Sequence, residues 1–351
     1  MKQTDDLRIA ATKELVSPAQ IHEQFPLTET SAATTALARQ EIQAVMDGSD
    51  HRMVVIVGPC SIHDPKSALE YADRLAELKK ELADDLVIIM RVYFEKPRTT
   101  VGWKGLINDP DLNNSYNVNK GLGIARDLLL SINDKGVPAG CEYLDLITPQ
   151  YTADVVSWGA IGARTTESQC HRELASGLSC PVGFKNGTNG NLQIAVDAIG
   201  SASNPHHFLS ITKEGRTAIF NSTGNKYTHI ILRGGSNQPN YSAQYVEESS
   251  QLLESASLKP KIMIDFSHAN SFKTPSRQRE VCDNVCEQVA GGEKRIFGVM
   301  IESHLVEGNQ KVVDGQPLTY GQSITDGCIG WADTEELCRK LANAVRSRKS
   351  G

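Results

Sequence analysis

LVIIMRVYFEKPRTTVGWKG, residues 86–105, joins the two features that decide the fold. Leu86–Met90 is a short apolar run typical of a buried strand. The segment that follows carries four cations within fifteen positions: Arg91, Lys96, Arg98 and Lys104. Cations beside hydroxyls and backbone amides are what a phosphate site needs, because each phosphate oxygen can accept a charge-assisted hydrogen bond. A cationic loop on its own is more often a solvated turn, so the rest of the chain decides between the two.

Eight apolar runs of this kind alternate with amphipathic helical segments. The runs begin near Met53, Leu86, Val137, Val155, Pro181, His229, Ile262 and Ile296. Helices are expected over residues 66–82, 119–133, 167–176, 192–202, 242–255, 277–289 and 334–346, with a short helix after Pro149. This alternation predicts an α/β protein built as a (β/α)₈ TIM barrel. A doubly wound open sheet is the alternative on periodicity alone.

Two segments lie outside the eightfold alternation. Residues 1–47 are mixed and helix-forming, with a helix start at Ser17-Pro18 and a helix over 32–46. They predict an N-terminal arm, which packs on the body or on another subunit, before a barrel domain of residues 48–351. Residues 207–211 and 217–220 flank Glu214-Gly215 and predict an inserted β-hairpin around 207–221.

The composition indicates a large globular protein. The 351 residues carry a net charge of −6 and 40% hydrophobic residues, enough for one barrel with an extension. Mild acidity argues against general binding to nucleic acid or to a membrane surface, and no run approaches the roughly 18 apolar residues of a membrane span. Eight cysteines in a chain of this length are no disulfide framework, and the N-terminus has no signal-peptide run. We therefore expect a reduced, cytoplasmic protein.

Each apolar run delivers a polar or charged residue to the same end. In a barrel, the carboxyl ends of the strands form the active face. In strand order these residues are Cys60 and His63; Arg91, Lys96 and Arg98; Glu142; Arg164 and Glu167; Lys185 and Thr188; Arg233; Asp265 and His268; Glu302 and His304. One of them alone would be a helix cap or a surface charge, but eight together predict an active site.

Two subsets of these residues suggest two kinds of ligand. A cationic bowl comprises Arg91, Lys96, Arg98, Arg164, Lys185 and Arg233. It holds too much charge for one monoanion and suits two phosphates, or a phosphate with a carboxylate. The second subset is Cys60, His268, Glu302 and Asp326, a mixed donor set fit for Mn²⁺, Fe²⁺, Co²⁺ or Zn²⁺. Taken alone, Cys60 would more readily be a buried inert thiol, and the other cysteines, including Cys282 and Cys286, are expected in the core.

Eight motifs spread over the chain resemble one enzyme family. They are GPCSIHD (58–64), MRVYFEKPRTTVGWKG (90–105), GARTTESQ (162–169), PVGFKNGT (181–188), ILRGG (231–235), IDFSHANS (264–271), ESHLVEGNQ (302–310) and SITDGCIGW (323–331). Together they resemble 3-deoxy-D-arabino-heptulosonate 7-phosphate (DAHP) synthase of the short, feedback-regulated type. The resemblance implies condensation of phosphoenolpyruvate with erythrose 4-phosphate and water, the first step of the shikimate pathway. It also implies one divalent metal ion per subunit, with Mn²⁺ favoured, and a homodimer or homotetramer.

The resemblance also implies roles for single residues. The metal ligands fall on Cys60, His268, Glu302 and Asp326. The phosphoenolpyruvate contacts fall on Arg91, Lys96, Arg164, Lys185 and Arg233, with Glu142 near the reacting centre. The erythrose 4-phosphate contacts fall on Arg98 and Thr99, with Lys96 and Pro97 beside them. Lys96 is the expected proton donor to the aldehyde oxygen. A Cys60–Cys328 disulfide is a hypothesis for oxidised, metal-free protein.

Inhibition by an aromatic amino acid is implied as well, at a pocket between barrel and hairpin that the arm of a neighbouring subunit completes. The matching positions are Asp5, Asp6, Tyr143, Gln150, Ser179, Phe208, Ser210 and Phe220. The aspartates would bind the α-ammonium group of the amino acid, and the aromatic side chains would pack against its ring. Ser210 matches the phenylalanine-sensitive type, whereas Phe220 departs from the smaller aliphatic residue of that type. Residues 315–323 are closer to tryptophan-sensitive members. We expect phenylalanine ahead of tryptophan, and tyrosine last. The alternative is that these residues only pack the hairpin onto the barrel.

Three other functions are alternatives, and for each of them a feature of the sequence argues against it. A related synthase that uses arabinose 5-phosphate would share the barrel, but the KPRTT segment at 96–100 argues against it. A metal-dependent aldolase or isomerase would not need six converging cations. A catalytically silent sugar-phosphate sensor would tolerate loss of a metal ligand or of Lys96, and none is lost.

Overall fold

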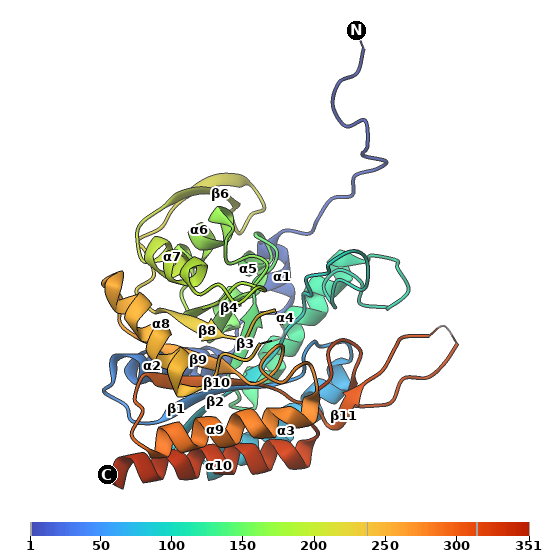
Figure 1. Ribbon diagram of the computed structural model, residues 1–351. Coiled ribbons are helices and arrows are strands. Elements are labelled where there is room, and N and C mark those ends of the chain that lie inside the picture. The colour runs from blue at the N-terminus through green and yellow to red at the C-terminus, as the bar shows by residue number, and fades with distance from the viewer. Residues whose placement is uncertain (1, 237, 314, 351) are drawn as a thin grey trace.

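The computed structural model describes residues 2–236, 238–313 and 315–350, and its core is a closed barrel of eight parallel strands (Figure 1). Their order around the barrel is β1-β10-β9-β8-β5-β4-β3-β2. The bounds are β1 (Met53–Gly58), β2 (Leu86–Arg91), β3 (Ala139–Glu142), β4 (Trp158–Ile161), β5 (Val182–Lys185), β8 (Thr228–Leu232), β9 (Ile262–Asp265) and β10 (Ile296–Glu302). The predicted (β/α)₈ barrel is confirmed, and the open sheet is excluded.

Helices follow the strands and cover the outside of the barrel. They are α3 (Pro65–Glu81), α4 (Val118–Asp134), α5 (Pro149–Thr152) with the 3₁₀ turn η1 (Ala153–Val155), α6 (Gln169–Gly177), α7 (Gln193–Ala202), α8 (Ala243–Ser255), η2 (Pro275–Arg277) with α9 (Gln278–Ala290), and α10 (Trp331–Ser350). In Figure 1, α3, α9 and α10 form the layer at the bottom of the view. None of the described helices is both long and apolar enough to cross a membrane.

Strand residues alternate between the barrel interior and the helix layer. Val54 and Ile56 pack into an interior cluster with Trp158 and Met263, whereas Val55 and Val57 belong to the larger cluster under the helices. Both sets are fully buried because each face of a parallel strand is covered. Within the interior, the Trp158 indole N–H donates to His229 Nε2 at 3.0 Å.

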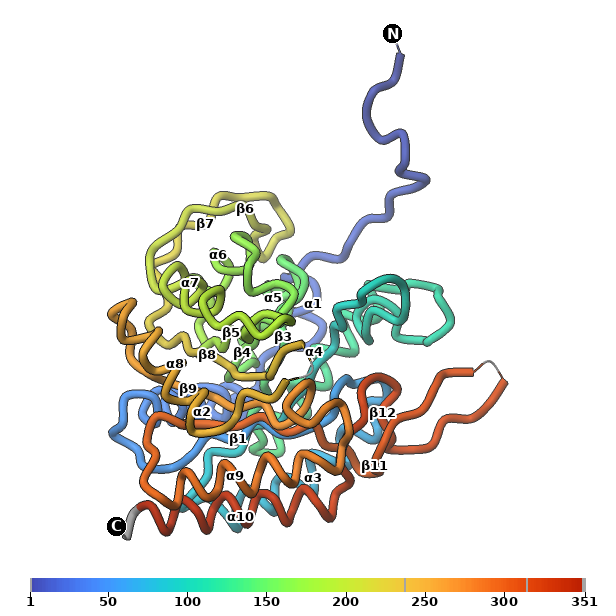
Figure 2. The backbone as a smooth tube through the Cα atoms, in the orientation of Figure 1, coloured from blue at the N-terminus to red at the C-terminus, as the bar shows by residue number. Residues whose placement is uncertain are grey.

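The first helices, α1 (Pro18–Gln24) and α2 (Glu29–Asp47), begin at the capping residues Ser17 and Thr28. Helix α2 buries Ile42, Val45 and Met46 against the interior cluster, so it contributes directly to the barrel core. Residues 2–13 extend away from the body in Figures 1 and 2, whereas Leu15 and Val16 pack against the core. The division into an arm of residues 1–47 and a barrel domain stays a prediction.

The inserted hairpin is present as β6 (His207–Ile211) and β7 (Thr217–Asn221), an antiparallel pair beside α6 and α7 (Figure 2). A ribbon that we did not predict pairs β11 (Val306–Asn309) with β12 (Gln322–Ser323). Its segment returns the chain to the barrel, where the Ile329 amide donates to the Glu302 carbonyl at 3.0 Å.

Two predicted strand starts were wrong by two or three residues. Val137 donates its amide to Ile132 at the end of α4, and Pro138 has no N–H to donate, so β3 begins at Ala139. Val155 closes the 3₁₀ turn η1, so β4 begins at Trp158. Among the cysteines expected in the core, Cys170 on α6 is exposed and Cys286 is half-buried.

Candidate active site and second pocket

The residues at the strand ends line one cavity of about 290 Å³. Every residue of the predicted cationic bowl lines it, as do Glu142, His268 and Asp326. Its floor is buried, with Arg91, Lys96, Glu142 and Lys185 each 8% exposed or less. Arg98, Thr99 and Arg164 lie at the exposed rim. The cavity therefore has cations at two depths, as two anionic groups would require.

Three predicted metal ligands converge beside this cavity. The ligand atoms of Cys60, Glu302 and Asp326 lie within 4.8 Å of one another. The fourth, His268, places Nε2 3.9 Å from Glu302 Oε1. These atoms come from loops after β1 and β9, from the last residue of β10, and from the segment after β12. The barrel thus brings together donors that are far apart in the sequence.

The environment of Glu302 fits a cation. Its Oε1 atom is buried and has no hydrogen-bond partner of good geometry among the described residues, although Arg91 Nη2 lies 3.1 Å away. The carboxylate of Glu302 is thus paired with one cation, Arg91, and keeps lone pairs that could bind a metal ion. Sulfur, imidazole and carboxylate donors together suit a transition-metal ion. The residues present therefore fit a divalent metal.

The imidazole of His268 is oriented by its neighbours. Its Nδ1 lies 2.9 Å from Asp265 Oδ2 and 2.7 Å from the Ser267 hydroxyl. A proton held on Nδ1 leaves the lone pair on Nε2, which faces Glu302. The backbone of His268 has a φ of 58°, so the chain turns sharply at the end of β9 to aim this ring.

Asp265 connects this histidine to a cation of the bowl. The same oxygen, Oδ2, accepts a hydrogen bond from Lys185 Nζ at 2.9 Å, while Oδ1 accepts from the amide and hydroxyl of Ser267. Burial opposes the charge on Asp265, but Lys185 and His268 outweigh it and hold its pKa well below the ordinary range. One buried carboxylate therefore positions two residues of the site.

Lys96 lies between the metal ligands and the bowl. Its Nζ donates to the Cys60 carbonyl at 3.3 Å and to Cys60 Sγ at 3.2 Å. Burial opposes its charge, yet the charges of Cys60, Glu142 and Glu302 outweigh that cost and raise its pKa. The charge of Arg91 opposes that of Lys96 but does not prevail. The raised pKa keeps Lys96 protonated, as the predicted proton donor must be.

Arg91 makes more contacts with the protein than a ligand contact would require. Its Nε donates to the Pro59 carbonyl at 3.0 Å and its Nη2 to the Cys60 carbonyl at 3.2 Å. The guanidinium also stacks 3.6 Å above the Tyr93 ring. These contacts fix the loop that carries Cys60, a task that sequence reasoning did not assign to Arg91.

The rim residues are held by the loop itself. Arg164 donates to Thr99 Oγ1 at 3.1 Å and to the Pro97 carbonyl at 3.4 Å. Gly102, with a φ of 150°, lies so close to Arg98 that a Cβ there would approach the guanidinium to 2.7 Å. Glycine at this position therefore lets the Arg98 side chain lie against the loop.

Sequence reasoning missed several cavity residues. Val101, Lys273 and Thr325 also line the cavity. Lys273 is a seventh cation and follows Phe272, and both residues have positive φ values. No sequence pattern indicated the turn that brings Lys273 to the rim. The neighbouring Cys328 accepts a hydrogen bond from the Cys60 amide at 3.4 Å, and a disulfide between the two stays a prediction.

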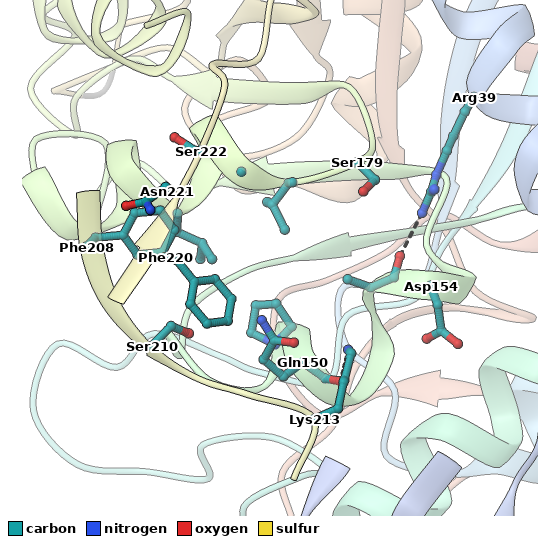
Figure 3. A pocket seen from close by; sticks show the side chains of 15 residues that line it. Arg39, Gln150, Asp154, Ser179, Phe208, Ser210, Lys213, Phe220, Asn221 and Ser222 are labelled. Atoms are coloured by element: carbon teal, nitrogen blue, oxygen red, sulfur yellow. Dashed lines mark hydrogen bonds between the residues drawn. The ribbon is translucent and has the colours of Figure 1, made fainter. Parts of the chain in front are cut away.

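A second cavity of about 540 Å³ lies between barrel and hairpin (Figure 3). Five predicted regulatory residues line it: Gln150, Ser179, Phe208, Ser210 and Phe220. The rings of Phe208 and Phe220 face each other with centroids 5.9 Å apart. Arg39, Asp154 and Lys213 supply charges on another side, as Figure 3 shows. Aromatic and charged groups around one cavity suit an aromatic zwitterion.

Three predicted regulatory residues do not line this cavity. Tyr143 is 2% exposed and packs behind it, against Gly159. Asp5 and Asp6 are exposed in the extended arm. A single chain therefore does not bring these acids to the cavity, and their predicted contribution from a neighbouring subunit stays a prediction.

Comparison with known proteins places this geometry in a family. Residues 24–339 match the family described as DAHP synthetase I. The chain is 62% identical over 347 residues to the Phe-sensitive phospho-2-dehydro-3-deoxyheptonate aldolase of Escherichia coli, covering 99% of both chains. It is 54% identical over 348 residues to the Trp-sensitive enzyme of that species, covering 99% of this chain and 100% of that one. A solved phospho-2-dehydro-3-deoxyheptonate aldolase from Francisella tularensis superimposes with a TM-score of 0.95 at 54% identity, covering 97% of this chain and 99% of that one.

Proposed function

The chain belongs to the DAHP synthetase I family, and from this premise we propose that it condenses phosphoenolpyruvate with erythrose 4-phosphate and water to give DAHP and phosphate. The observation that carries the proposal is one cavity lined by the six predicted cations, beside ligand atoms of Cys60, Glu302 and Asp326 that lie within 4.8 Å of one another, with His268 Nε2 3.9 Å from Glu302. Both substrates are phosphorylated, so they repel each other in solution. A cationic cavity converts that encounter into a positioned pair.

The different depths of the cations support separate binding positions for the two substrates. Lys185 lies at the floor with Arg91 and Lys96, and Arg233 is half-buried in the same cavity, where the smaller phosphoenolpyruvate would bind. Arg98 and Thr99 at the rim would take the phosphate of erythrose 4-phosphate. Glu142 lines the cavity 8% exposed and would orient water near the reacting centre. Gly162 leaves room for it, because a Cβ there would come within 2.3 Å of the Glu142 carboxylate.

Cys60, His268, Glu302 and Asp326 would hold one divalent metal ion, with Mn²⁺ favoured and Fe²⁺, Co²⁺ or Zn²⁺ as alternatives. Such an ion supplies Lewis-acid polarisation of the aldehyde. Lys96 then donates its proton to the aldehyde oxygen as the new carbon–carbon bond forms, since an ammonium group within the bowl is suited to a developing negative charge. Water adds at C2 of the former phosphoenolpyruvate, and cleavage of the C–O bond releases phosphate.

We further propose that the second cavity binds the feedback inhibitor. The neighbouring rings of Phe208 and Phe220, tilted 48° to each other, would receive the ring of the inhibitor, with Ser210 limiting its size. The higher identity to the Phe-sensitive relative supports phenylalanine over tryptophan, and tyrosine is the least favoured. Asp5 and Asp6 from a neighbouring subunit would bind the α-ammonium group in a homodimer or homotetramer. A reducing, cytoplasmic location would keep the Cys60 thiol available as a ligand.

Product analysis tests the activity. With phosphoenolpyruvate and Mn²⁺ present, erythrose 4-phosphate should yield DAHP and an equivalent of phosphate, whereas arabinose 5-phosphate should yield little product. Equal turnover of both sugars would favour the related synthase. Binding of both substrates without product would favour a catalytically silent sensor.

A further inference from the structure

Gln278 is a fully buried amide side chain with both of its polar atoms bound to one residue. Its Nε2 donates to the Glu302 carbonyl at 2.9 Å, and its Oε1 accepts from the Glu302 amide at 3.0 Å. Gln278 is the first residue of α9 and is 0% exposed. A side-chain amide here reproduces the donor and acceptor of a peptide group.

Glu302 needs a substitute for a peptide group because the neighbouring strand β9 ends before it. Strand β9 pairs with β10 up to Asp265, which lies opposite Met300, and the Phe266 amide then donates to the Met300 carbonyl at 2.9 Å. Beyond that point the chain turns away to place Ser267 and His268 in the site. In a parallel ladder alternate residues face the same neighbour, so Glu302 presents its amide and carbonyl where β9 has ended. Gln278 occupies that place.

The anchored backbone belongs to a proposed metal ligand. Glu302 Oε1 is buried and lies 3.1 Å from Arg91 Nη2, so the direction of this carboxylate depends on that ion pair and on the position of the Glu302 backbone. On the opposite side, β1 pairs with β10 through Gly58 and Glu302. The Glu302 carbonyl also accepts from the Ile329 amide at 3.0 Å, so Gln278, Ile329 and β1 together hold the Glu302 backbone at the strand end.

We propose that Gln278 is a positioning residue for the metal site, acting through the backbone of Glu302. This inference rests on the proposed metal site and goes beyond it, because Gln278 touches neither metal nor substrate. Residues that orient metal ligands typically change metal affinity 10- to 100-fold when they are replaced. We expect the same range here.

Mn²⁺ binding, followed by electron paramagnetic resonance of the free ion, tests the proposal without relying on activity. Gln278→Met keeps the length of the side chain and removes both bonds, and it should raise the Mn²⁺ Kd by about 10- to 100-fold. Gln278→Glu keeps an acceptor but, when ionised, has no donor for the Glu302 carbonyl, so it should also weaken binding and serves as the second variant if the first folds poorly. Gln288→Met is the matched control, because Gln288 lies on the same helix and donates to the backbone carbonyl of Tyr241, outside the site.

The outcomes separate this inference from the site itself. Wild-type protein should bind one Mn²⁺ per subunit, and Glu302→Ala should lose it; if wild type binds none, the metal site and this inference are both wrong. If Glu302→Ala loses the ion but both Gln278 variants bind it with the Kd of Gln288→Met, the metal site stands and the positioning role is refuted. A Gln278→Met protein with weaker Mn²⁺ binding and the thermal stability of Gln288→Met supports the proposal.

Discussion

The ammonium group of Lys96 lies 3.2 Å from the sulfur of Cys60. This contact joins the predicted phosphate-binding loop after β2 to a predicted metal ligand after β1. It places the expected proton donor beside the expected metal rather than at the rim with Arg98. The residues predicted to bind the substrates and those predicted to activate the aldehyde are therefore in contact at Lys96 and Cys60.

Replacing Lys96 with methionine should separate chemistry from binding. The variant keeps the length of the side chain and loses the proton, so kcat should fall by a factor on the order of 10²–10⁴. Phosphoenolpyruvate binding should weaken much less, because other cations of the cavity remain. Steady-state kinetics and direct titration of phosphoenolpyruvate would measure the two effects.

Lys104→Met is the control for that experiment. Lys104 is exposed on the same loop and does not line the cavity, so its replacement should leave kcat near that of wild type. If phosphoenolpyruvate affinity collapses with kcat in Lys96→Met, Lys96 acts as an electrostatic anchor and not as the acid.

Inhibition should depend on the inner face of the hairpin. Ser210 lines the second cavity, whereas its neighbour Leu209 points outward and is 83% exposed. Ser210→Phe should fill the cavity and raise the inhibitory concentration of phenylalanine at least tenfold, with uninhibited kcat little changed. Leu209→Phe adds bulk on the other face and should retain inhibition, and removal of residues 1–12 should relieve it. A wild-type enzyme indifferent to phenylalanine, tryptophan and tyrosine would refute the regulatory assignment.

The buried carboxyl group of Glu95 lies between segments that reach the two cavities, and burial raises its pKa to about 8. Glu95, adjacent to Lys96, accepts hydrogen bonds from the Thr148 hydroxyl at 3.0 Å and from the Asp145 amide at 3.2 Å. Thr148 directly precedes Pro149 and Gln150, which line the second cavity. Thr148→Val removes one of these bonds and should weaken inhibition severalfold while phenylalanine still binds. Calorimetry should show the retained binding; unchanged inhibition in this variant would exclude this route.

The interior histidine predicts a pH dependence of stability. Burial lowers the pKa of His229 from 6.5 to about 4. The unfolded chain therefore binds more protons than the folded chain between these values, so stability is present above pH 6.5 and is lost as the pH falls towards 4, by up to about 3 kcal/mol. His229→Gln should flatten this part of the profile, since glutamine can still accept from Trp158. Denaturant midpoints of both proteins across pH 4–7 would measure it, and parallel profiles would contradict the assignment.

The strand ends were predictable from the sequence because each apolar run stops where a polar residue begins. Glu142, Lys185 and Glu302 are the last residues of their strands, as the pattern indicated. Errors arose where the chain leaves the periodic pattern. Val155 has a strand-forming side chain but closes a 3₁₀ turn. Local propensity does not reveal such contacts, because tertiary packing decides them.

The supporting contacts of the site could not be predicted. Lys273 reaches the cavity through a turn with positive φ at two non-glycine residues. Residues other than glycine seldom adopt this backbone conformation. Gln278 and Asp265 act through hydrogen bonds to other site residues, and such partners leave no spacing signal. Tyr143 matched a position of the pocket but packs behind its wall. A residue pattern identifies which side chains gather, whereas the backbone path determines which of them touch.

The central claim is that one cavity uses a bound divalent metal and two phosphorylated substrates in a single condensation. The most direct measurement is the rate of phosphoenolpyruvate loss in chelator-stripped protein, with and without Mn²⁺ and with and without erythrose 4-phosphate. The account predicts loss only when both are added, and little loss under any condition in a Cys60→Ala protein. Full turnover in rigorously metal-free protein, or equal loss of phosphoenolpyruvate without erythrose 4-phosphate, would contradict it.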